Sequence, residues 1–216
     1  MQQQPFERSK HVYHSEEFVE LVKDAVRFFN GTPVHSLPLQ ERFFGTGVYA
    51  LYYTGNNPAY RRYAELNRLE YKYPIYVGKA VPKGWRQSRT SHDAAIKPSA
   101  ELYSRIREHI RNIDTVEGID QNDFSCRFVI FEAEGSDMIG TIEAALIKLN
   151  RPLWNSSLDG FGNHTPGAGR FNQAKSDWDV IHPGRAWADK CTGIPREEAD
   201  ILERIKAHLS TLGDEA

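Results

Sequence analysis

The fold is decided by two short stretches, Gly47-Val48-Tyr49-Ala50-Leu51-Tyr52-Tyr53 and Pro74-Ile75-Tyr76-Val77-Gly78. Both are rich in β-branched and aromatic residues, which favour strands. Each also places a tyrosine beside a glycine, and a glycine in a strand allows a ligand or another backbone segment to approach closely. We therefore expect two neighbouring strands, each carrying a tyrosine next to an open backbone position.

The segment between these strands, Asn56 to Tyr71, has apolar side chains at helical spacing and arginines on its other side. It is expected to be a helix inserted between the two strands. After the second strand, Lys79 to Lys97 is polar and is expected to be a loop.

The rest of the chain alternates helix and strand patterns. We expect a helix from a Ser15 cap to Gly31, a helix starting near Ser99, a strand over Ser125 to Ala133, a short helix from Gly140 to Asn150, an irregular region over Trp154 to Thr192, and an outer helix over Pro195 to Leu209. The predicted fold class is α/β (α+β), with a small three-stranded antiparallel sheet flanked by helices. One domain is expected over residues 1–216.

Bulk composition indicates a folded protein without a membrane segment. Hydrophobic residues make up 40% and charged residues 26% of the 216 residues, close to the average for globular proteins. The chain has neither a long apolar run nor an apolar signal-peptide core near Met1. Since only Cys126 and Cys191 are present, a disulfide framework is not expected, and we predict a cytoplasmic protein.

Charge is unevenly distributed although the net charge is only −2. Between Arg61 and Arg111 there are twelve lysines and arginines against five acidic residues, so the flanks are acidic. This pattern is typical of a local cationic groove for nucleic acid on an otherwise acidic protein, although a solvated basic helix face would look the same.

Several other kinds of site are disfavoured. His164, His182 and Cys191 do not have zinc-site spacing. The glycine-rich segment Gly162 to Gly169 lacks the lysine and hydroxyl residue of a phosphate-binding loop, and no Gly-x-Ser-x-Gly elbow occurs.

The triplets Gly47-Val48-Tyr49 and Tyr76-Val77-Gly78 resemble the motif of the GIY-YIG nucleases, with valine in place of isoleucine and a longer gap between them. Members of that family carry, in order, an arginine on the next helix, a metal-binding glutamate on a later helix, and an asparagine beyond it. Arg105, Glu143 and Asn155 occupy those places in this sequence. The resemblance implies a nuclease core over about residues 45–156, with N- and C-terminal additions.

Each position has a chemical role that suits phosphodiester hydrolysis. Glu143 is the candidate metal ligand, for one Mg²⁺ per site with Mn²⁺ as a substitute, because one carboxylate suffices for an ion that keeps several waters. Arg105 offers a planar fork of donors for a phosphate. His109 lies four residues later, so both side chains leave one helical face. Outside this pattern, a surface glutamate, arginine or histidine would be the ordinary interpretation of each.

Tyr49 is the candidate general base or water-orienting group, with His109 able to accept its proton, so either residue could be the final acceptor. Tyr76 is expected to position water or phosphate. Asn155 is expected to orient site groups or a phosphate. Core packing of the tyrosines and a turn role for the asparagine are the competing interpretations.

Four basic residues after the second triplet are candidate DNA contacts: Lys79, Lys83, Arg86 and Arg89. The last three flank Trp85 in the polar loop, a combination that could enter a groove of DNA.

The chain has little room for a separate DNA-binding domain. In this respect it resembles the type II restriction endonucleases of the family. The resemblance implies cleavage of double-stranded DNA at a short palindrome, leaving 5′-phosphate and 3′-hydroxyl ends, by a homodimer whose two-fold axis matches that of the DNA. A structure-specific repair nuclease and a non-catalytic DNA-binding protein on the same fold are the alternatives.

Overall fold

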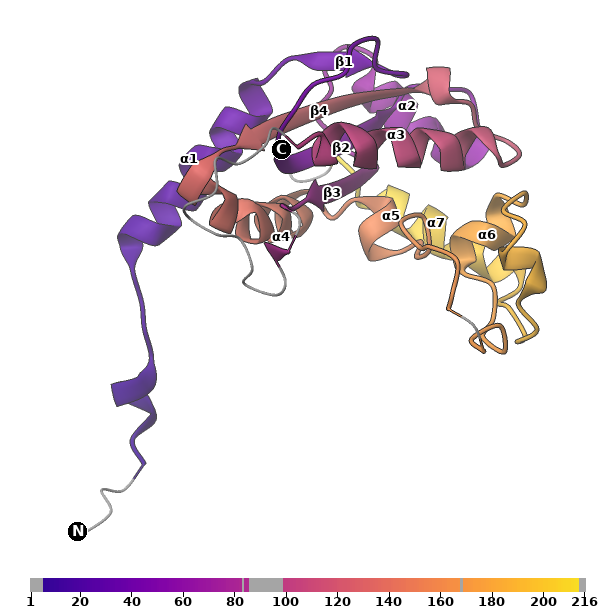
Figure 1. Cartoon of the computed structure of the whole chain (residues 1–216). Helices are drawn as coiled ribbons and strands as arrows, with labels where there is room; N and C mark the ends of the chain where they lie inside the picture. The colour runs from indigo at the N-terminus through magenta and orange to yellow at the C-terminus, as the bar shows by residue number, and fades with distance from the viewer. Residues whose placement is uncertain (1–5, 83, 86–98, 168, 214–216) are drawn as a thin grey trace.

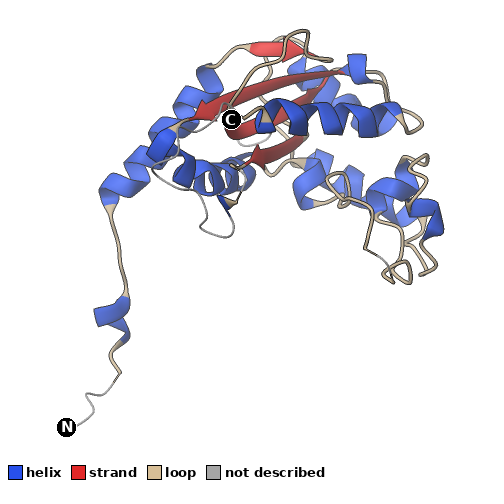
Figure 2. Ribbon diagram, in the orientation of Figure 1, coloured by secondary structure: helices blue, strands red, loops and turns tan. Residues whose placement is uncertain are grey.

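The computed structural model describes residues 6–82, 84–85, 99–167 and 169–213. Its centre is a four-stranded antiparallel sheet in the order β1-β4-β2-β3, with helices on both faces (Figures 1 and 2). The strands are β1 (Val34–Ser36), β2 (Thr46–Tyr53), β3 (Tyr76–Ala80) and β4 (Phe124–Phe131). The α/β class is therefore confirmed.

The three expected strands correspond to β2, β3 and β4. The expected number of three strands was wrong, because the sheet has a fourth strand, β1. This strand pairs Val34 with Arg127 and Ser36 with Ser125 of β4. It is only three residues long, half-buried to exposed and partly polar, so it lacks the alternating apolar pattern that identifies a strand in a sequence.

The helices are α1 (Glu16–Gly31), α2 (Arg61–Asn67), α3 (Glu101–Asp114), α4 (Ile139–Asn150), α5 (Leu153–Ser156), α6 (Asp177–Ile181) and α7 (Glu198–Ser210). Single 3₁₀ turns are η1 (Arg8–His11), η2 (Pro58–Tyr60), η4 (Gln121–Asp123), η5 (Ala133–Met138) and η6 (Ala188–Lys190). As predicted, the Ser15 hydroxyl caps α1 by accepting a hydrogen bond from the Phe18 amide at 3.1 Å. No described helix has the length and hydropathy needed to cross a bilayer.

Strand β2 separates two hydrophobic layers, because alternate side chains of a strand point to opposite faces. All eight of its residues are buried. Tyr49, Leu51 and Tyr53 belong to the layer that includes α2, α3 and the C-terminal helices. Val48, Ala50 and Tyr52 belong to the layer formed with α1 and α4.

The region expected to be irregular, Trp154 to Thr192, packs closely against the first of these layers. It contains the short helices α5 and α6 and contributes buried Trp154, Phe161 and Trp178 to the core. The Arg185 guanidinium is buried in the same region and donates to the Asp179 carboxylate at 2.6 Å. Short helices held by aromatic contacts and a buried ion pair carry no long periodic pattern, which is why the sequence did not predict this packing.

Helix α7 is more buried than the outer helix expected from the sequence. Ile201 and Ile205 are 0% and 1% exposed and lie in the same core layer as Tyr63 of α2. The Tyr63 hydroxyl and His208 Nε2 lie 3.4 Å apart, which joins the inserted helix to the C-terminal helix.

Candidate active site

The two motif tyrosines lie side by side on one face of the sheet, at its β3 edge. Tyr49 pairs with Gly78 and Leu51 pairs with Tyr76, so Tyr49 and Tyr76 are diagonal neighbours. Their ring centroids are 6.2 Å apart. A Cβ atom on Gly78 would lie 2.5 Å from the Tyr49 hydroxyl oxygen, so the glycine of the second triplet makes room for the phenol of the first.

The Tyr49 hydroxyl meets an imidazole. His109 Nε2 lies 2.5 Å from it, and both side chains are almost fully buried. Burial lowers the pKa of His109 well below its usual value, and the nearby Arg105 charge lowers it further, so the ring is neutral at neutral pH. Burial raises the pKa of Tyr49, which the charge of Arg105 opposes, so the phenol keeps its proton. Tyr49 and His109 are therefore a neutral pair joined by a hydrogen bond.

Phe161 covers this pair from the C-terminal region. Its ring stacks on His109, with centroids 4.6 Å apart and an interplanar angle of 20°, and meets Tyr76 edge-on at 4.9 Å. A Cβ atom on the next residue, Gly162, would lie 3.0 Å from the Tyr76 hydroxyl oxygen. Phe161 could not be predicted from the sequence, because a single aromatic residue in an irregular segment carries no positional signal.

Arg105 lies one helical turn before His109 on α3, as expected, and its side chain is 26% exposed. The guanidinium donates to the Glu108 carboxylate and to His164 Nε2, both at 2.8 Å. His164 Nδ1 in turn lies 3.0 Å from the second Glu108 oxygen. Arg105 is thus held by Glu108 on its own helix and by His164, which lies 59 positions later in the sequence. Only the three-residue spacing of Glu108 from Arg105 could have indicated this contact in the sequence.

Glu143 approaches the same edge from the opposite face of the sheet. It lies on α4, and its carboxylate accepts a hydrogen bond from the Lys79 ammonium at 2.5 Å. Lys79 pairs with Val48 in the β3 register, which places it on the α4 face. The Glu143 and Lys79 side chains are 19% and 32% exposed, so this ion pair is partly open to solvent.

Tyr76 lies on the edge strand, where charged groups from both faces of the sheet affect its pKa. Burial raises its pKa, the Arg105 charge lowers it, and the Glu143 carboxylate raises it. A cationic guanidinium and an anionic carboxylate therefore act on one phenol from opposite sides of β3. A groove of about 740 Å³ beside this strand is lined by Lys79, Arg105 and His164 among others.

Asn155 holds the edge strand beside Tyr76. Its side-chain oxygen accepts a hydrogen bond from the Val77 amide and its side-chain nitrogen donates to the Val77 carbonyl, both at 2.8 Å. These contacts use the amide on the backbone of β3, so in this structure Asn155 orients the strand that carries Tyr76.

Glu143 suits a hydrated divalent cation. Among the described residues there is no group of three or more histidine, cysteine, aspartate or glutamate side chains that could hold a metal, so a site here would have one protein carboxylate. Mg²⁺ commonly binds in this way, with waters and phosphate oxygens as its remaining ligands. The Lys79 ammonium at the carboxylate indicates that a cation fits at this position.

Of the four expected DNA contacts, Lys79 is engaged with Glu143. Lys83, Arg86 and Arg89 lie outside the described residues.

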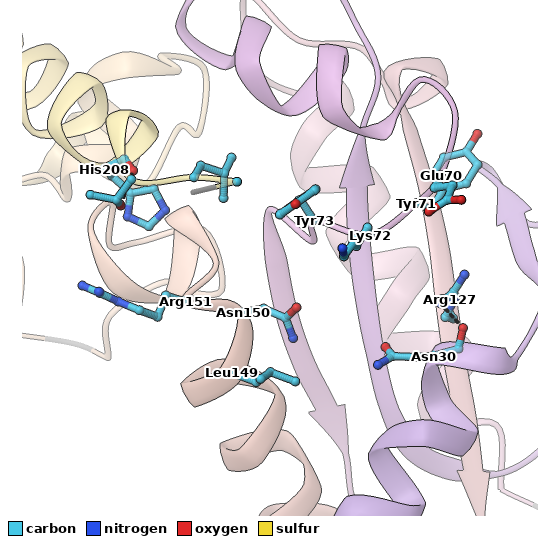
Figure 3. A pocket seen from close by; sticks show the side chains of 13 residues that line it. Asn30, Glu70, Tyr71, Lys72, Tyr73, Arg127, Leu149, Asn150, Arg151 and His208 are labelled. Atoms are coloured by element: carbon cyan, nitrogen blue, oxygen red, sulfur yellow. Dashed lines mark hydrogen bonds between the residues drawn. The ribbon is translucent and has the colours of Figure 1, made fainter. Parts of the chain in front are cut away.

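A second hollow, of about 720 Å³, lies between the C-terminal ends of α1, α4 and α7 and contains Arg127, Arg151 and His208 (Figure 3). It contains none of the motif residues. The motif residues gather instead at the β3 edge, which is therefore the candidate site.

Comparison with known families identifies the family of the chain. The family model described as the Eco29kI GIY-YIG domain matches residues 41–209, which is well over half of the chain and includes the C-terminal region that carries Phe161 and His164. Among curated proteins none matches the chain. A match of this extent, on a fold that gathers both tyrosine triplets, the arginine and the glutamate at one strand edge, shows that the chain belongs to the Eco29kI family of GIY-YIG restriction endonuclease domains.

Proposed function

We propose that this protein is a Mg²⁺-dependent type II restriction endonuclease that cuts both strands of double-stranded DNA at a short palindrome. The products would carry 5′-phosphate and 3′-hydroxyl ends. The observation that carries the proposal is that Arg105 lines one groove with Lys79, whose ammonium is bonded to the Glu143 carboxylate, so a positive donor and a carboxylate lie at the same strand edge.

Arg105 is assigned to the developing charge on the phosphate. Its guanidinium stays protonated throughout and presents donors in a fixed plane, which suits the equatorial oxygens of a pentacovalent transition state. The contacts from Glu108 and His164 hold it in place before substrate binds, so little reorganisation is needed during reaction.

The tyrosines and His109 are assigned to the proton of the attacking water. Tyr76 is half-buried on the edge strand β3, whereas Tyr49 on the neighbouring strand β2 is 0% exposed. A water reaches the Tyr49 hydroxyl only if the neighbouring rings shift, for example when DNA binds. His109 Nε2 is the proposed acceptor of the phenolic proton as Tyr49 accepts one from water. Because burial lowers the pKa of His109, this transfer requires the same change of surroundings that admits the water.

Glu143 is assigned as the protein ligand of the metal. When bound, Mg²⁺ would supply Lewis-acid stabilisation of the phosphate and of the leaving 3′ oxygen. Asn155 keeps Tyr76 in position through the Val77 backbone.

The protein is proposed to act as a homodimer on DNA. One chain carries one such site, and cutting both strands of a palindrome requires two sites related by a two-fold axis.

The decisive experiment incubates the purified protein with plasmid DNA and Mg²⁺ and sequences the ends of the products. A type II enzyme gives discrete fragments with one common end sequence. Cleavage confined to branched or flapped DNA would replace the proposal with a repair role, and binding without cleavage would contradict catalysis.

Glu143→Gln should lower the cleavage rate by about a thousandfold or more while DNA binding persists, because loss of a metal ligand removes several kcal/mol of transition-state stabilisation. The matched control is Glu203→Gln, which changes a solvent-exposed glutamate paired with Lys206 on α7. Equal cleavage by the wild-type and Glu143→Gln proteins would remove Glu143 from the site.

A further inference from the structure

We propose that Lys79 is a built-in counter-ion that competes with the divalent metal for Glu143 and must leave the carboxylate when the metal binds. This inference rests on the proposed function, since it concerns the same carboxylate. It assigns Lys79 to the control of metal affinity, in addition to any contact with DNA.

The ion pair is specific in its geometry. The Lys79 ammonium and the Glu143 carboxylate lie 2.5 Å apart, although the residues are 64 positions apart in sequence and belong to β3 and α4. Among the described residues, the Lys79 ammonium and the Glu143 carboxylate form ion pairs only with each other. A Cβ atom on Gly140, one turn earlier on α4, would lie 3.9 Å from the ammonium nitrogen, so the ammonium lies close to the surface of this helix.

Both cations need the same carboxylate. Mg²⁺ and Mn²⁺ bind through carboxylate oxygens, and a lysine ammonium at hydrogen-bonding distance occupies one of them and repels an approaching cation. Because the pair is partly shielded from water, the repulsion between the ammonium and the metal ion is screened less than at a fully exposed site. Metal binding therefore requires the ammonium to move away.

The displaced ammonium could contact a phosphate in the neighbouring groove. Lys79 lines the same groove as Arg105, beside the strand edge where the phosphate is proposed to bind. Arrival of the metal would thus transfer the lysine charge from Glu143 to a phosphate oxygen. Metal binding and phosphate binding would then favour each other through this one side chain.

The test measures Mn²⁺ binding without DNA, by the electron paramagnetic resonance signal of free Mn²⁺ in a titration of the full-length protein. Lys79→Met should bind Mn²⁺ about three- to tenfold more tightly than wild type, because removing a partly buried ion-pair partner frees the carboxylate. Lys79→Arg should bind as weakly as wild type, because it restores the positive charge.

Lys175→Met is the matched control. Lys175 forms a comparable ion pair with Asp189 at 2.6 Å, and its side chain is 29% exposed against 32% for Lys79. This change should leave Mn²⁺ affinity at the wild-type value. Thermal melts of all variants verify that each protein is folded.

The outcomes separate this inference from the proposed function. If Lys79→Met binds Mn²⁺ no more tightly than wild type, or shows no saturable binding, competition by Lys79 is overturned. If Glu143→Gln in the Lys79→Met background leaves Mn²⁺ binding unchanged, the metal does not bind Glu143, and the proposed metal assignment fails as well.

Discussion

The two sides of strand β3 handle charge in opposite ways. On the α3 side, Tyr49 and His109 form a buried pair under Phe161, and burial keeps both groups neutral. On the α4 side, Lys79 and Glu143 form a charged pair that is partly open to solvent. In the proposed function, the buried side holds the groups assigned to proton transfer, and the open side holds the carboxylate assigned to the metal.

This difference follows from the cost of burying charge. An ion without a partner in a dry environment costs several kcal/mol, so groups enclosed there remain neutral or are fully paired. A metal that enters with its waters needs access, which the solvent-facing edge provides. The comparison can be sharpened or broken by changes confined to one side.

The largest effect on folding is expected from Arg185, which supports the cover over the buried side. Its guanidinium bonds Asp179 and the backbone carbonyls of Gly160 and Phe161 while it is 4% exposed. Arg185→Ala should lower the free energy of unfolding by about 3–5 kcal/mol, because it leaves a buried carboxylate unpaired. Urea unfolding measures this.

Arg196→Ala is the control for that change. The Arg196 side chain is 43% exposed and pairs with Asp177, and its loss should cost about 1 kcal/mol or less. Equal losses for the two variants would show that the buried pair has no special role.

Arg105 lines the same groove as Lys79, and its removal should affect chemistry more than folding. Arg105→Ala should lower the single-turnover cleavage rate by about 10²- to 10³-fold, because one donor to a transition-state oxyanion contributes about 3–4 kcal/mol. Arg107→Ala, on the exposed side of the same helix, should cut at nearly the wild-type rate. A similar loss from both variants would indicate a general effect of charge on DNA binding.

Acid should destabilise the buried side through its histidines. Burial lowers the pKa of His182 to about 4, and its Nε2 lies 2.6 Å from the Tyr60 hydroxyl. In the unfolded chain the usual pKa is about 6.5, so the unfolded state binds more protons between these values. The stability contributed by the neutral ring is complete above pH 6.5 and is lost as the pH falls toward 4.

The loss from His182 amounts to at most about 3 kcal/mol. Urea unfolding at a series of pH values should show a shallower fall for His182→Gln than for wild type across this window. His109 shifts in the same direction and should add to the same fall. Parallel curves for wild type and His182→Gln would show that His182 is not held neutral by burial.

The smallest effect is expected from Gly78→Ala, which tests the close packing of the buried side. The added methyl group would lie 2.5 Å from the Tyr49 hydroxyl oxygen and would displace it from His109. Overpacking of this kind costs about 1–2 kcal/mol. Calorimetric melting and cleavage assays should both show a decrease, whereas unchanged values would mean that Tyr49 has room to move.

The sequence predicted the parts of this site that carry local patterns. Strands β2 and β3 were found because their tyrosines, valines and glycines are typical of strands, and the helical spacing of Arg105 and His109 put them on one face. The ordered positions of Arg105 and Glu143 came from the family resemblance. The strands and the helical spacing depend only on residues close together in the sequence.

The missing parts depend on contacts between distant segments. His164 meets Arg105 across 59 residues, and Lys79 meets Glu143 across 64. Phe161 stacks on His109 across 52 residues, and the backbone carbonyl of Phe161 accepts a hydrogen bond from Arg185, which is paired with Asp179. A single sequence contains no periodicity that reports such pairs.

Asn155 has a consequence for the behaviour of the protein in solution. β3 is an outer strand, and the unpaired backbone groups of outer strands invite other chains to add to the sheet. Asn155 satisfies both the amide and the carbonyl of Val77, and the Trp154 amide donates to the Ile75 carbonyl at 3.0 Å. The same contacts that orient Tyr76 therefore cover part of this sheet edge, which leaves fewer unpaired backbone groups for another strand beside the candidate site.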